Sequence, residues 1–180
     1  MNYQVALLQQ QPSFLHALAQ WHQQEWRASG RSVPITRRVQ RLRSHMKNDL
    51  LPNTWVAYQA HELLGSVSLV DYVFQDPSDA SAWIANLFVL PQLRGRGLGR
   101  QLLAHAEQEA QDLDLQRLFL FTPTQRTFYE HQGWSFLHQA RVQGQWVDVM
   151  LKRLTQPDNW VSEQQFIRGE TQVPPSQSRW

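Results

Sequence analysis

Three glycines alternate with larger residues between a predicted strand and a predicted helix, and this feature most constrains the fold of the chain. The stretch reads VLPQLRGRGLGRQLL, from Val89 to Leu103, with glycine at positions 95, 97 and 99. A glycine-rich turn that leads into a helix leaves free backbone amides pointing outward, and the helix dipole adds partial positive charge. Glycine also lets those amides approach phosphate oxygens, because no Cβ stands in the way. We therefore expect an anion site at this turn.

The spacing of the glycines excludes two common nucleotide-binding loops. The dinucleotide fingerprint G-x-G-x-x-G differs in its spacing, and no acidic residue ends a strand about 20 residues further on. The loop G-x-x-x-x-G-K-[ST] needs a lysine that does not follow these glycines. Three arginines still add charge that suits a pyrophosphate, namely Arg94, Arg96 and Arg100.

The order of the predicted elements favours a sheet with helices packed on its faces. Apolar runs and their periodicity predict, in order, a strand at 3–10, helices at 14–26 and 35–48, a hairpin at 53–74, a buried strand at 83–90, a helix at 98–112, a strand at 117–122, a short helix that begins after 122 and ends at Gly133, and a closing hairpin at 135–154. This order is neither a simple alternation of strands and helices nor all strands. It indicates an α+β, or mixed α/β, fold.

Composition describes a globular chain and excludes several kinds of site. Of the 180 residues, 42% are hydrophobic and 18% are charged, which is typical of a folded domain. The net charge of only +2 is too small to indicate a nucleic-acid partner, although the sequence pI is near 9.3. The absence of cysteine excludes disulfides, thiolate metal sites and cysteine nucleophiles. The histidines lack metal-ligand spacing, so we expect no metal.

Two further expectations concern localisation and domains. The amino terminus has no basic segment followed by an apolar core, and no window is long and apolar enough to span a membrane. These patterns predict a cytoplasmic protein without a membrane partner. We expect one domain over residues 1–154 and a polar tail over residues 155–180 that contains Pro174 and Pro175.

The spacing R-x-x-G-x-G from Arg94 to Gly99, preceded by V-x-P, resembles the coenzyme A loop of the GNAT superfamily of N-acetyltransferases. The resemblance extends from Tyr3 to about Leu154 in element order and includes FYEHQGW, from Phe128 to Trp134. The alternative is a glycine-rich connection with surface arginines. The resemblance implies the GNAT acyl-CoA transferase fold, in which a central, mostly antiparallel sheet is splayed between two parallel strands and flanked by helices. It also implies acetyl-CoA as cosubstrate.

The resemblance assigns roles along this stretch. The pantetheine arm would pair with the backbone of the strand at Leu87, Phe88 and Val89. The pyrophosphate would lie on the loop, whose contacts are mainly backbone amides. The residues that match the loop are Arg94, Gly95, Arg96, Gly97, Leu98 and Gly99, with Arg100 at the start of the helix behind it.

Tyr129 matches the tyrosine that protonates the departing CoA thiolate in many members of the superfamily. A phenol near the sulfur can supply a proton as charge develops there. The alternative is a tyrosine that packs at a helix end. The asparagine that many members carry before this tyrosine is missing, and only Thr122, Thr124 or Gln125 could replace it.

The acceptor side of the site is less defined by the sequence. The strands at 83–90 and 117–122 contain no carboxylate, so no general base is identified. Asp71 is the acidic residue that could act as the base, through a water molecule. Alternatively, Asp71 only forms part of the turn at the end of its strand. In this fold the acceptor site would be bordered by the end of the first helix, at Glu25, Trp26 and Arg27. Trp26 would either contact the substrate or pack inside the protein.

These observations lead to one principal function and two alternatives. The principal function is transfer of acetyl from acetyl-CoA to a primary amine of a small molecule, peptide or protein, by direct attack within a ternary complex. The first alternative is a non-catalytic CoA-binding sensor or partner domain. The second is a nucleic-acid module built on the basic helix from Arg37 to Lys47, which the modest net charge disfavours. We expect a monomer or a homodimer.

Overall fold

The structure is a computed structural model and describes residues 2–28, 33–47, 49–73, 80–142 and 144–154. Within these residues, seven strands form one sheet in the order β1-β2-β3-β4-β5-β7-β6. The strands are β1 (Gln4–Leu7), β2 (Asn53–Gln59), β3 (Glu62–Val73), β4 (Ala80–Val89), β5 (Arg117–Thr122), β6 (Ser135–Val142) and β7 (Gln145–Arg153). The α-helices are α1 (Leu15–Ala28), α2 (Ile35–Ser44), α3 (Leu98–Asp112) and α4 (Arg126–Glu130). The mixed α/β fold class expected from the element order is confirmed.

The chain divides into two compact units. Among the described residues, the first unit combines those up to Asp71 with 84–113, and the second combines those in the range 72–83 with those from Asp114 onward. Strands β3 and β4 therefore contribute residues to both units.

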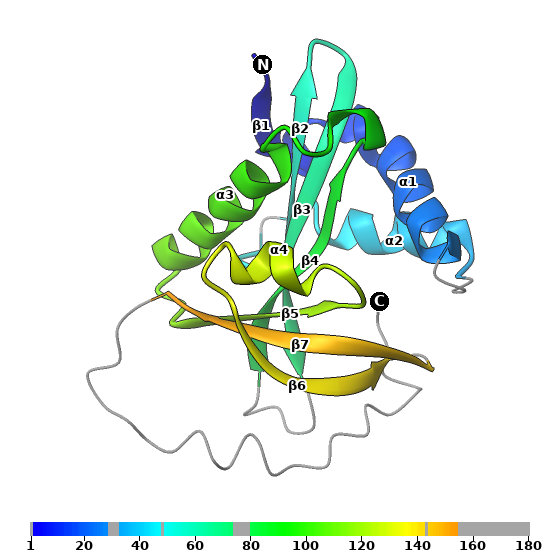
Figure 1. Cartoon of the computed structure of the whole chain (residues 1–180). Helices are drawn as coiled ribbons and strands as arrows, with labels where there is room; N and C mark the ends of the chain where they lie inside the picture. Colours follow the sequence, from blue (N-terminus) through cyan, green and yellow to red (C-terminus); the bar gives the residue numbers. More distant parts are fainter. Residues whose placement is uncertain (1, 29–32, 48, 74–79, 143, 155–180) are drawn as a thin grey trace. The chain divides into compact units, whose positions relative to one another are not determined.

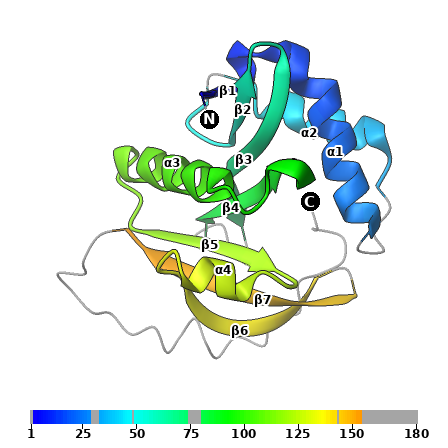
Figure 2. The ribbon, with the colours of Figure 1, turned by 45° about the horizontal axis from the view of Figure 1, so that its top comes forward.

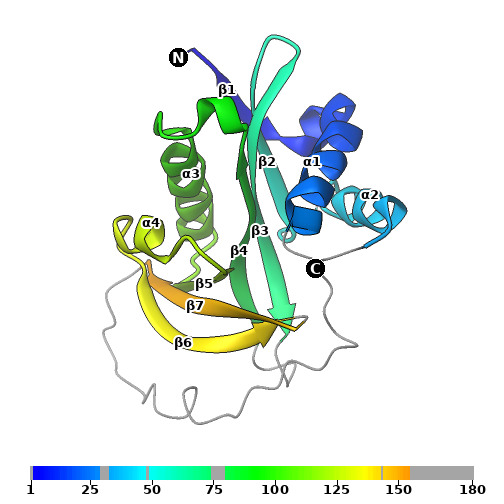
Figure 3. The same cartoon turned by 45° about the vertical axis from the view of Figure 1, so that its right-hand side comes forward.

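In the first unit, the alternation of side chains along β2 places helices on both faces of the strands. Helices α1 and α2 lie on one face and α3 lies on the other (Figures 1 and 3). Val56 of β2 belongs to the apolar core under α1 and α2, and it is fully buried. The adjacent Trp55 instead meets His105 of α3, with ring centroids 5.5 Å apart. This period of two is what a strand covered on both sides requires.

The second unit is built around β5, β6 and β7. Strand β7 pairs antiparallel with β5 on one side and β6 on the other. Helix α4 lies beside these strands (Figure 2). Trp83 is almost fully buried, and its ring lies 5.2 Å from Phe119 and 4.3 Å from Phe121. Three large aromatic side chains thus pack together in this unit.

The predicted elements are all present among the described residues, but several boundaries differ. The helix predicted at 35–48 ends at Ser44, and the short helix predicted to end at Gly133 spans only Arg126–Glu130. The expected strand at 3–10 ends at Leu7, and Leu8–Gln10 forms a 3-10 turn closed by a hydrogen bond from the Gln11 amide to the Leu8 carbonyl. Pro12 has no amide hydrogen for a strand ladder, and the turn buries Leu8 completely. The strand expected at 83–90 begins earlier, at Ala80, and ends at Val89.

In the described part of the chain, none of the helices is long and apolar enough to cross a membrane. In the same residues, no cluster of three or more histidine, aspartate or glutamate side chains could hold a metal ion. The predicted tail at 155–180 lies outside the described residues.

Candidate functional site

The glycine loop connects the end of β4 to the start of α3 through a short 3-10 turn, Pro91–Leu93. Gly95 and Gly97 have φ values of +73° and +87°, in the left-handed region. Other residues adopt this region at a cost, so these two glycines are needed for the path of the loop. A Cβ built on Gly95 would meet no described atom within 4 Å, so the loop leaves open space there.

The first turn of α3 offers three backbone amides to a ligand. The first helical hydrogen bond runs from the Gln101 amide to the Gly97 carbonyl, at 3.1 Å. The amides of Leu98, Gly99 and Arg100 therefore have no acceptor within the helix. Among the described residues no side chain caps this terminus, and its first turn contains no acidic residue. With the helix dipole, this arrangement favours an anion.

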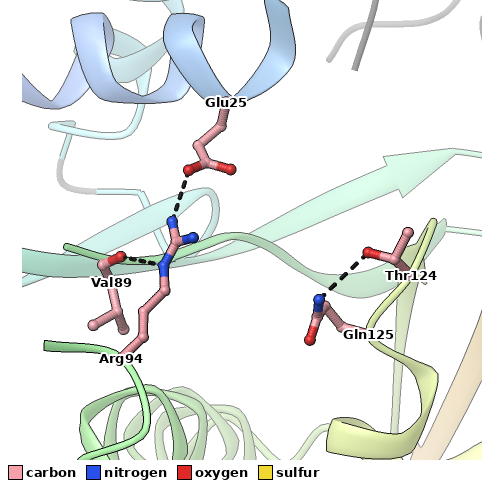
Figure 4. Close-up of polar contacts among 5 residues, drawn as sticks. All are labelled: Glu25, Val89, Arg94, Thr124 and Gln125. Carbon is pink, nitrogen blue, oxygen red and sulfur yellow. Dashed lines mark hydrogen bonds and ion pairs between the residues drawn. The ribbon is translucent and has the colours of Figure 1, made fainter. Parts of the chain in front are cut away.

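Arg94 holds the loop against β4 and α1. Its Nε donates to the Val89 carbonyl at 3.0 Å, and its Nη2 donates to Glu25 Oε1 at 2.7 Å (Figure 4). Its guanidinium carbon lies 5.6 Å from the centre of the Phe88 ring. The side chain predicted to supply charge for phosphate thus already bridges two elements, while Arg96 and Arg100 are exposed.

The predicted cofactor strand, Leu87 to Val89, is half-buried and closely supported from two sides. Phe88 packs on Trp21 of α1, with ring centroids 5.2 Å apart. On β3, a Cβ at Gly65 would lie 2.7 Å from the Phe88 carbonyl oxygen and 2.9 Å from Leu102 Cδ1. Glycine at position 65 therefore permits the close approach of this segment to β3.

Asn86 lies just before this segment and was not among the predicted site residues. It has a φ of +53° although it is not glycine. Ser66 Oγ donates to its carbonyl oxygen at 3.0 Å, and its Nδ2 donates to Ser68 Oγ at 3.1 Å. The sequence signal was the pair of serines at alternate positions in the otherwise apolar run SVSLV. Polar residues with this spacing lie on one face of a strand.

Tyr129 lies in α4 and is buried in the second unit. Its ring contacts Phe128 at 5.0 Å and Trp134 at 6.1 Å between centroids. Burial raises the pKa of its phenol from 10.0 to about 12, because the charged form would lose its hydration. Tyr129 is therefore protonated at neutral pH and can donate a hydrogen bond.

The remaining predicted residues are placed as follows. Thr122 is buried and accepts a hydrogen bond from the Gln125 amide at 2.9 Å, and Gln125 Nε2 donates to Thr124 Oγ1 at 3.4 Å (Figure 4). Asp71 is exposed near the end of β3. The side chain of Trp26 lies outside the described residues.

A family model matches the middle of the chain. Residues 52–135 match the family model of the acetyltransferase (GNAT) domain. None of the curated proteins matches the chain at a significant level.

Solved structures share the fold at low sequence identity. An acetyltransferase from Streptococcus agalactiae is 18% identical with a TM-score of 0.66, covering 84% of this chain and 98% of its own. An aminoglycoside 6'-N-acetyltransferase in complex with coenzyme A is 13% identical with a TM-score of 0.69, covering 87% of this chain and 99% of its own. The yncA protein of Salmonella typhimurium, with its cofactor acetyl-CoA, is 18% identical with a TM-score of 0.68. The match covers 90% of this chain and 99% of the yncA chain. The fold of this chain is that of GNAT acetyltransferases.

Proposed function

The chain carries a GNAT acetyltransferase domain, and from this premise we propose that it transfers acetyl from acetyl-CoA to a primary amine. The observation that carries the proposal is the loop from Arg94 to Gly99. It combines two left-handed glycines with the uncapped amino terminus of a 15-residue helix. Structures of the same fold contain coenzyme A or acetyl-CoA, which supports this ligand.

The loop residues would hold the pyrophosphate of acetyl-CoA mainly through their backbone. Leu98 contributes its amide alone, because its side chain is 3% exposed and lies in the core. Arg96 and Arg100 are exposed and add positive charge beside the amides. The backbone of Leu87 to Val89 would pair with the pantetheine arm, as the resemblance implies.

Tyr129 would assist the departure of the thiolate as a hydrogen-bond donor. An amine attacks the thioester carbonyl and forms a carbon–nitrogen bond, the nitrogen gives up a proton to water, and negative charge develops on sulfur as the carbon–sulfur bond breaks. An ordinary thiol has a pKa near 8.5, so complete proton transfer from a phenol of pKa about 12 would be uphill by on the order of 5 kcal/mol. A hydrogen bond that strengthens as charge develops requires no complete transfer. The final proton on sulfur would then come from solvent.

In this proposal a primary amine accepts the acetyl group. Neither the glycine loop nor Tyr129 indicates which class of amine it is. A fold does not fix a substrate. Asp71, Glu25 and Trp26 remain the predicted residues of the acceptor side, with Asp71 acting on the amine through water. Glu25 is held by Arg94, which ties it to the cofactor loop.

Calorimetry with acetyl-CoA tests the cofactor site, and the chain offers a matched control. Gly97→Asp places a side chain and a negative charge where phosphate would lie, so binding should be lost. Gly144 of the β6–β7 hairpin has a similar φ of +83° and open space around it. Gly144→Asp imposes the same strain and charge elsewhere and should bind like the parent protein.

A thiol-release assay across peptide amines, polyamines, aminoglycosides and amino acids then tests turnover. Release of CoA with one of these amines supports the enzyme. Acetyl-CoA binding without release by any amine favours the non-catalytic CoA-binding domain. A folded parent protein that does not bind acetyl-CoA contradicts the proposal altogether.

A further inference from the structure

A chain of buried hydrogen bonds connects both amino-terminal helices to Asn86. His22 Nε2 of α1 lies 3.0 Å from Ser66 Oγ, which donates to the Asn86 carbonyl. On the other branch, Asn86 Nδ2 donates to Ser68 Oγ, and Ser68 Oγ lies 2.8 Å from Thr54 Oγ1. His45, just after α2, completes this branch with Nδ1 at 2.8 Å from the threonine hydroxyl.

A count of protons fixes the direction of the α1 branch. The single hydroxyl proton of Ser66 is used on the Asn86 carbonyl. His22 must therefore carry its proton on Nε2 and donate it to Ser66. The imidazole is neutral, because burial, the nearby Arg38 and His45 lower its pKa to about 3. His22 thus acts as a fixed donor in this chain.

Because these hydrogen bonds are buried, losing any one of them is costly. Thr54, Ser66 and Ser68 are completely buried, and both histidines are nearly so. A buried hydroxyl without a partner is costly, so each member of the chain restricts the others to one arrangement. The only half-buried member is Asn86, where both branches meet.

Asn86 adopts a left-handed backbone conformation, which is unusual inside a strand. A left-handed residue inside a strand costs energy unless it is glycine, and asparagine is among the few side chains that tolerate it. Such an outlier persists only when surrounding contacts hold it, and these outliers concentrate at functional sites. Here the contacts are the hydrogen bond that Asn86 accepts from Ser66 and the one that it donates to Ser68.

The strained residue directly precedes the segment from Leu87 to Val89. The other end of this segment is held by the hydrogen bond from Arg94 to the Val89 carbonyl, and Phe88 packs on Trp21. The three peptide units between these anchors are therefore fixed at both ends.

We propose that His22, Ser66 and Ser68 are positioning residues that lock Asn86 and thereby pre-order Leu87 to Val89 for acetyl-CoA. This inference rests on the proposed function. A segment that is already ordered loses no backbone freedom when a ligand pairs with it, and this raises affinity without any new contact.

The test compares acetyl-CoA affinity, by calorimetry, with stability, by urea unfolding. Ser66→Ala removes the link from His22 to the Asn86 carbonyl. We expect the dissociation constant to rise by about tenfold, the effect of freeing roughly one residue's backbone. Gln23→Ala is the matched control, because Gln23 is also a buried polar residue of α1, donating to the Val33 carbonyl at 3.0 Å. It should lower stability but leave acetyl-CoA affinity unchanged.

Two substitutions of Asn86 provide a second, milder test. At an ordinary strand position alanine is better tolerated than glycine. At a left-handed position the order reverses, so Asn86→Gly should bind acetyl-CoA more tightly than Asn86→Ala. Equal affinities of Ser66→Ala and Gln23→Ala, with Asn86→Ala binding at least as tightly as Asn86→Gly, would overturn the inference while leaving the proposed function intact. A parent protein that does not bind acetyl-CoA would overturn both.

Discussion

Arg94 shows how one side chain can organise a predicted site through contacts within the protein. It binds the last carbonyl of β4 and pairs with Glu25, which lies 69 positions away in the sequence. Both side chains of the ion pair are half exposed, so the pair itself contributes at most about 1 kcal/mol to stability. The main role of the contact between Arg94 and Glu25 is therefore to position the loop. Because surface ion pairs weaken with salt, this position should be most sharply defined at low ionic strength.

Tyr129 allows a direct test of the proposed chemistry at the scale of one hydroxyl. Tyr129→Phe keeps the ring contacts with Phe128 and Trp134, so the fold should survive. Removing one donor to a developing anion typically costs 10²- to 10³-fold in rate. We expect kcat to fall by about this range while the KM for acetyl-CoA changes little, measured by steady-state kinetics. An unchanged kcat in the folded variant would make Tyr129 a packing residue.

At the scale of elements, the approach of β4 to β3 depends on a missing side chain. Gly65→Ala would place a Cβ 2.7 Å from the Phe88 carbonyl oxygen, which belongs to the backbone and cannot turn away. Overpacking of this kind typically costs 1–3 kcal/mol, so urea unfolding should show a loss of about this size. Because Phe88 lies in the proposed cofactor segment, acetyl-CoA affinity should fall as well. A variant as stable as the parent would show that the strands separate without cost.

Local pattern predicted the elements, but not the contacts that join them. Apolar runs and their periodicity predicted the ends of the strands and helices to within a few residues, and the glycine spacing predicted the loop. The first strand was predicted too long, because its apolar run continues into the turn that buries Leu8. The bond between His22 and Ser66 spans 44 positions, and no local periodicity announces it. The left-handed turn at Asn86 could not be predicted either, since asparagine tolerates that conformation without requiring it.

At the scale of the whole molecule, the two buried histidines make stability depend on pH. Burial, followed by nearby charge, lowers the pKa of His22 to about 3 and that of His45 to about 4, while both would titrate near 6.5 in the unfolded chain. Below pH 6.5 the unfolded state therefore binds protons that the folded state does not. Stability is fully present above this pH and is lost as pH falls toward 4.

Urea unfolding at pH 7 and pH 5 measures this effect. Each histidine should account for roughly 2 kcal/mol of lost stability at pH 5, since one unit of pKa difference corresponds to about 1.4 kcal/mol. As a control, the ring resonances of His22 and His45 in the folded protein should not titrate between these pH values. A free energy of unfolding that stays constant from pH 7 to pH 5 would contradict the prediction.

Leu98 faces two ways, with its side chain in the core and its amide at the start of α3, beside the glycine loop. A ligand on that amide binds only the folded chain, so mass action makes ligand concentration a determinant of stability. At a concentration one hundred times its dissociation constant, a ligand raises the free energy of unfolding by about 2.7 kcal/mol. The melting temperature would then report occupancy directly. Fragments of coenzyme A could be ranked by their thermal shifts before any acetyl acceptor is known.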